Sequence, residues 1–122
     1  MASAPLPPAR GLIDTPLLLA YREAEPDAVA FLRAVQAGGK PDVSQISVLA
    51  LYAWCRDRLD VAAVRTFIGL LDVHGVTAHT MRRAQRLLDA LPPPAGLTAD
   101  DAIAAATALE HSLPLYTPDP GR

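Results

Sequence analysis

Short apolar runs alternate with longer stretches of helical periodicity along the whole of this 122-residue chain. Strand-like runs at residues 11–13, 73–77 and 113–117, together with an extended segment at 41–44, separate helical patterns at residues 16–21, 26–37, 46–58, 61–71, 80–91 and 98–111. Such alternation predicts an α/β domain with a central, mostly parallel β-sheet. The strand-like runs lack polar alternation, so we expect α-helices on both faces of the sheet.

Composition agrees with one globular domain, which we place at residues 10–122 behind a flexible lead-in at residues 1–9. Hydrophobic residues make up 51% of the chain, and its net charge of -2 argues against a protein that coats nucleic acid non-specifically. A single cysteine, Cys55, excludes an internal disulfide and a cysteine-based zinc site. No apolar run is long enough for a membrane span, and the proline-rich start is unlike a secretory signal, so we expect a cytoplasmic protein without a membrane partner.

Three aspartates occupy comparable places in this pattern. Asp14 ends the first strand, Asp101 lies in the first turn of the helix at 98–111, and Asp119 follows the last strand. Ligands of open α/β sheets gather at the carboxyl ends of the strands. Carboxylates that converge there repel one another and need a cation, and Mg²⁺ or Mn²⁺ suits ligands that are all oxygen. The sequence therefore predicts a metal site that activates water.

Each aspartate also has a structural interpretation. Asp14 is a candidate helix cap, although Thr15 followed by Pro16 offers another. Asp101 completes a capping-box pattern with Thr98, and Asp119 suits a turn between two prolines. We expect surface or structural roles for the three histidines, His74, His79 and His111, because no convergent ligand spacing links them.

The motifs around these acids resemble those of PIN domains. Residues 12–15, Leu-Ile-Asp-Thr, resemble the opening strand of that family, and residues 43–47 resemble the segment before its second acidic position. Residues 101–111 resemble its late helix, which runs into a final strand at 113–117 as it does here. The resemblance spans residues 11–119 and points to the VapC-like ribonuclease toxins of bacterial type II toxin–antitoxin pairs.

The resemblance implies a PIN-like fold and a Mg²⁺- or Mn²⁺-dependent endoribonuclease. It implies that Asp14, Asp101 and Asp119 are the catalytic and metal-binding residues. It also implies an RNA substrate, a cognate antitoxin and a homodimer, for which the helices around Tyr52, Trp54 and Phe67 offer apolar surface.

The family's second acid, normally a glutamate, is missing. Its place falls on Ala50, or on Ala53 in a looser register. Natural drift to a non-catalytic role and a deliberate replacement that disarms a toxic nuclease both account for an alanine there. We therefore expect a weakened or inactive nuclease. The alternative is a catalytically dead PIN-fold domain that binds a protein or RNA partner.

Overall fold

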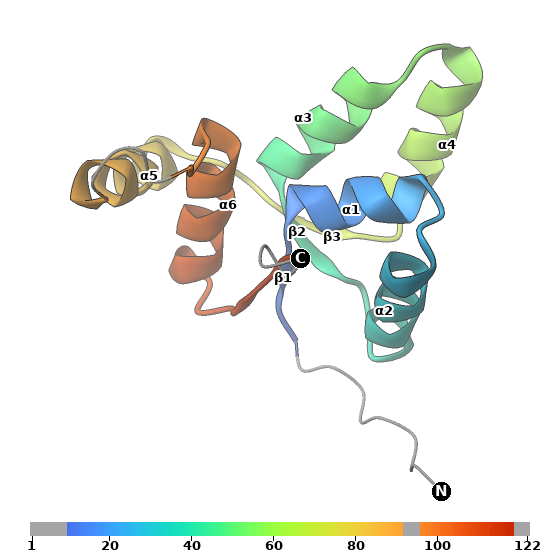
Figure 1. Cartoon of the computed structure of the whole chain (residues 1–122), viewed down its shortest axis with the longest axis horizontal. Coiled ribbons are helices and arrows are strands. Elements are labelled where there is room, and N and C mark those ends of the chain that lie inside the picture. The colour runs from blue at the N-terminus through green and yellow to red at the C-terminus, as the bar shows by residue number, and fades with distance from the viewer. Residues whose placement is uncertain (1–9, 92–95, 119–122) are drawn as a thin grey trace, which may run out of the picture.

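The computed structural model describes residues 10–91 and 96–118, arranged as a four-stranded sheet between two groups of helices (Figure 1). The lead-in at residues 1–9 and the candidate ligand Asp119 lie outside the described residues. In chain order the elements are β1 (Leu12–Ile13), α1 (Thr15–Arg22), α2 (Pro26–Ala37), β2 (Asp42–Ser44), α3 (Gln45–Trp54), α4 (Arg58–Ile68), β3 (Asp72–His74), α5 (Ala78–Ala90), α6 (Ala99–Glu110) and β4 (Leu115–Tyr116).

The four strands are parallel and lie in the order β3-β2-β1-β4. This order puts the first strand of the chain in the interior of the sheet, where both of its residues are fully buried. The predicted parallel α/β architecture is therefore confirmed. Parallel strands share one direction, so the sheet has a carboxyl edge that includes Asp14 and an amino edge that includes Asp42.

The two residues of β1 show how each face is covered. Ile13 packs into the larger core with residues of α1–α4, including Leu18, Leu32 and Val64. Leu12 faces the opposite way and packs against Ala104 and Ala108 of α6. Successive side chains of a strand alternate between faces, so the unbroken apolar run reflects a sheet that is buried on both sides. Figure 1 shows α5 and α6 on one side and α1–α4 on the other.

Side-chain caps set where several helices begin. Asp57 accepts a hydrogen bond from the Asp60 N–H, so α4 starts at Arg58 and not at residue 61 as predicted. At α1 the cap is Asp14 and not Thr15, because the Asp14 carboxylate accepts the Thr15 N–H. Among the described residues, no helix is long and apolar enough to cross a membrane.

Close packing between β1 and β4 depends on Gly11. A Cβ atom added there would lie 2.5 Å from Cε2 of Tyr116 and 3.0 Å from the Pro114 carbonyl oxygen. Glycine is therefore needed for its lack of a side chain, which lets β4 approach β1.

Candidate functional site

Asp14 lies at the carboxyl edge of the sheet, where β1 turns into α1. Its side chain is buried, with 5% exposure for the residue, and Oδ1 accepts the Thr15 N–H at 2.9 Å. The structural role that the sequence suggested is thus present, but a cap does not require a buried carboxylate. Capping alone therefore does not explain why this carboxylate is buried.

The electrostatics of Asp14 disfavour its ionised form. Burial raises the pKa of the Asp14 carboxyl, and the hydrogen bonds from Thr117 and Thr15 lower it by less. The charge on Asp101 raises the same pKa further, so the two carboxylates interact electrostatically. A buried carboxylate that also feels a like charge is a place where a cation would be stabilised. That both residues are metal ligands stays a prediction.

Asp101 lies in the first turn of α6 and forms the predicted capping box. Its Oδ2 accepts the Thr98 N–H at 3.0 Å, and the Thr98 hydroxyl accepts the Asp101 N–H at 3.1 Å. The capping bond uses one carboxylate oxygen, Oδ2. Capping holds the carboxyl group at the helix N-terminus, where the helix dipole favours a negative charge.

The segment that leads to Asp119 also reaches this site. The Thr117 side chain hydrogen-bonds to Asp14, two residues before Asp119 in the chain. Asp119 itself lies outside the described residues, so its place near the metal remains an expectation.

Ala50, the position of the missing acid, lies in α3 and is half-buried, whereas Ala53 is exposed. One turn before Ala50, the Ser47 hydroxyl lies 2.7 Å from the Thr15 hydroxyl, and both residues are buried. Through Thr15 this contact connects α3 to the residue that follows Asp14. The half-buried environment fits the register through Ala50 better than the one through Ala53. The side chain of an alanine offers no ligand atom to a cation.

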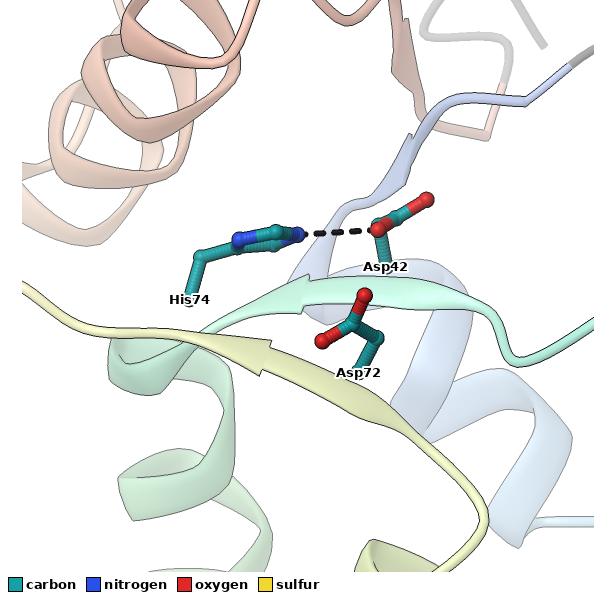
Figure 2. Close-up of side chains that lie close together, drawn as sticks. All are labelled: Asp42, Asp72 and His74. Carbon is teal, nitrogen blue, oxygen red and sulfur yellow. Dashed lines mark hydrogen bonds and ion pairs between the residues drawn. The ribbon is translucent and has the colours of Figure 1, made fainter.

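A second polar cluster, here called the amino-edge cluster after its two acids, lies over one face of β2 and β3 (Figure 2): Asp42 and Asp72 begin the two strands, and His74 ends β3. Asp42 accepts two hydrogen bonds from the Arg10 guanidinium, each at 2.9 Å, and its Oδ1 lies 2.8 Å from Nε2 of His74. Asp72 lies beside them, with Oδ2 4.0 Å from Nη2 of Arg10. Burial acts to raise the pKa of Asp42, but hydrogen bonds and charge from Arg10 and His74 together lower it.

The sequence did not predict this amino-edge cluster. His74 has a partner in Asp42, as the expected structural role requires, but the acids around it were not identified. One signal was available: β2 reads Asp-Val-Ser and β3 reads Asp-Val-His, so each strand opens with an acid before a valine. An acid at the start of a short strand is also common on surfaces, and the pairing of β2 with β3 was needed to interpret it.

Comparison with known proteins gives similarities in structure alone. No protein-family model and no curated protein matches the sequence. A solved structure of a toxin–antitoxin complex from Klebsiella pneumoniae matches with a TM-score of 0.73 and 21% identity, covering 89% of this chain and 86% of the other. VapBC2 from Rickettsia felis, bound to a DNA fragment from the promoter, matches with a TM-score of 0.67 and 14% identity, covering 88% and 86%. The chain therefore has the PIN-like α/β fold of VapC-type proteins, as its sequence predicted.

Proposed function

We propose that this protein is the toxin of a toxin–antitoxin pair, a Mg²⁺- or Mn²⁺-dependent endoribonuclease that is weakened or inactive because alanine occupies position 50. The observation that carries the proposal is the buried Asp14 carboxylate, whose pKa is raised by burial and by the charge of Asp101. Both structural neighbours come from toxin–antitoxin systems, which supports the same assignment.

Asp14 and Asp101 would hold the cation, with Asp119 contributing directly or through water. When bound, the cation would supply an activated water and stabilise the negative charge that develops on a phosphodiester. The protein's part is to fix the carboxylates. Asp14 is held by the Thr15 N–H and by Thr117, and Asp101 is held by its capping box with Thr98. The ligand atoms that the three aspartates would offer are all oxygens, as Mg²⁺ prefers.

An antitoxin and a second copy of the chain are the protein partners that we propose, with RNA as the substrate and the cytoplasm as the compartment. The hairpin of α3 and α4 carries exposed apolar side chains, with Leu49 60% and Leu59 80% exposed and Tyr52 beside them in α3. These residues offer an apolar contact surface. Phe67, expected at this surface from the sequence, lies in the core instead and stacks on Tyr21.

A PIN-fold binding module without catalysis is the second candidate. The absence of an acid at position 50 favours this candidate, because losing a metal ligand should reduce activity more than losing a residue that only supports a ligand. Even changes in supporting residues typically reduce metal affinity or activity about 10- to 100-fold. In this case the helical surface would bind its protein or RNA partner, and the remaining acids would serve as caps.

Ribonuclease assays on Ala50→Glu distinguish the two candidates. We expect the variant to cleave structured RNA with Mg²⁺ at least about 10- to 100-fold faster than the original chain. The activity should disappear with chelator and in the double variant Ala50→Glu/Asp14→Asn, which keeps an oxygen for capping. A folded Ala50→Glu protein that binds no Mg²⁺ and cleaves nothing would rule out the nuclease proposal and leave the binding module.

A further inference from the structure

The amino-edge cluster brings Asp42 together with Asp72 and His74, which follow it in the chain by 30 and 32 residues. Asp42 and Asp72 are the first residues of β2 and β3 and lie opposite each other in the parallel register. His74 lies two residues after Asp72, on the same face of β3, and its ring reaches back to Asp42. In Figure 2 the three side chains lie on the same face of the two strands.

Distances within the cluster are close to those that a metal ion requires. One ligand atom from each of Asp42, Asp72 and His74 lies within 4.8 Å of the other two. Tetrahedral Zn²⁺ with bonds of about 2.0–2.2 Å holds its ligand atoms roughly 3.4 Å apart. Asp72 has a side chain that is 53% exposed, so its carboxylate can turn inward to close the difference.

The cluster already holds a cation, which is the Arg10 guanidinium. The Asp42 side chain is 2% exposed and would be costly to bury without a positive charge. Arg10, by contrast, is 66% exposed, so it can leave the carboxylate and remain solvated. A cavity of about 280 Å³ adjoins these groups and is lined by Arg10, Asp42 and Asp72 together with Gly38, Gly39 and Lys40. The cavity reaches both carboxylates and Arg10, and His74 is not among the residues that line it.

We propose that Asp42, Asp72 and His74 form a site for a divalent transition metal of the Zn²⁺ class, in which the metal replaces Arg10 as the counter-cation of Asp42. The donor set, one imidazole nitrogen and two carboxylates, suits Zn²⁺ with a water in the fourth position. The bound ion cross-links β2 to β3. Its two carboxylates begin their strands, whereas Asp14 follows the end of β1, and the site does not depend on the proposed nuclease function.

Metal titrations on the full chain test the proposal. An Asp14→Asn background weakens the carboxyl-edge site while keeping its helix cap. In that background we expect one equivalent of Zn²⁺ to bind by calorimetry and to raise the melting temperature. Co²⁺ should give the visible absorption bands of a tetrahedral site. His74→Gln should abolish Zn²⁺ binding, the rise in melting temperature and the Co²⁺ bands. The amide of the new glutamine can still donate a hydrogen bond to Asp42 and so preserve the fold. The matched control is His79→Gln, which removes an exposed histidine near Glu110 and should bind Zn²⁺ as before.

Arg10→Gln gives the opposite expectation. Removing the competing cation should tighten Zn²⁺ binding on the order of 10- to 100-fold, the range typical of changes beside a metal site. Zn²⁺ should also stabilise this variant more than the parent, because it supplies the missing charge at Asp42. Binding that His74→Gln leaves unchanged, or that Arg10→Gln weakens, overturns the proposal. If Arg10→Gln does not fold even with Zn²⁺, the comparison of His74→Gln with His79→Gln decides alone.

Discussion

The hydroxyl oxygens of Thr15 and Ser47 lie 2.7 Å apart in the protein interior and join α1 to α3. Thr15 follows Asp14 directly, and Ser47 precedes Ala50 by one helical turn. The pair therefore sets how position 50 lies relative to the candidate site. Whatever residue occupies position 50, its spacing from Asp14 depends on this buried contact.

Ser47→Ala should destabilise the fold by about 1–3 kcal/mol, because it leaves the buried Thr15 hydroxyl without its partner. Thr15→Val/Ser47→Ala, which removes both polar groups, should be less destabilised than the sum of the single variants. Urea unfolding of all four proteins gives the coupling energy, expected between about 0.5 and 3 kcal/mol. If the losses of unfolding free energy in the two single variants add up to the loss in the double variant, the hydroxyls do not interact.

Asp14→Asn should raise the melting temperature at neutral pH when no metal is present. The folded-state pKa of Asp14 lies above its ordinary value of 3.8, so between these two values the folded protein holds more protons than the unfolded chain. The contribution of Asp14 to the stability of the fold is fully present below pH 3.8 and is lost as the pH rises through the folded-state pKa. The advantage of Asn, whose amide oxygen keeps the cap, should therefore vanish in acid.

Melting temperatures measured against pH in EDTA check this expectation. Mg²⁺ or Mn²⁺ added at neutral pH should stabilise the original chain and have little effect on the Asn variant. If the original chain instead gained stability over the variant as the pH rose, burial would not be the dominant influence on this carboxyl.

Ala50→Glu and Ala53→Glu should differ in their response to Mg²⁺. Position 50 is half-buried, so an added carboxylate there should lower stability without metal and recover it when Mg²⁺ is added. Position 53 is exposed, and glutamate suits an exposed helix site, so Ala53→Glu should change the melting temperature little and independently of Mg²⁺. Melting temperatures of the two variants, measured with Mg²⁺ and with EDTA, check this expectation. If only Ala53→Glu responded to Mg²⁺, the missing acid would belong at position 53.

Gly11→Ala should destabilise the contact between β1 and β4. The new Cβ would lie 2.5 Å from the Tyr116 ring, which has to move, and 3.0 Å from a backbone oxygen. Overpacking of this kind typically costs about 1–3 kcal/mol. Gly38→Ala is the matched control, because its Cβ would meet nothing closer than 3.6 Å. Equal unfolding free energies for the two variants would contradict this account of the packing.

Much of the fold followed from local signals in the sequence. Apolar runs marked β1 and β4, and Thr98 with Asp101 marked the start of α6. The strand expected at residues 73–77 was wrong in its bounds, because β3 begins at Asp72 and ends at His74, before Gly75. Boundaries were less accurate where two capping residues compete: α1 is capped by Asp14 although Thr15 is also a good cap, and α4 begins after Asp57. Capping preference ranks such neighbours nearly equally, so tertiary packing decides between them.

For the candidate site, Asp14 stood out in the sequence because it ends a buried strand, and burial and the charge of Asp101 both raise its pKa. That Asp14, Asp101 and Asp119 converge on one cation stays a prediction. The amino-edge cluster was not predicted, because Asp42 and His74 meet through the register of β2 and β3. Register between strands that are separated by two helices is set by the whole core and leaves no local signal.

Among the strands of residues 10–91 and 96–118, β3 forms one margin of the sheet and pairs with β2. It is three residues long, begins with the charged Asp72 and is followed by Gly75. A long, apolar outer strand invites another chain to extend the sheet through backbone hydrogen bonds, which leads to aggregation. Shortness and charge protect this margin from such growth. We therefore expect crowded copies of the protein not to join into fibrils through this margin.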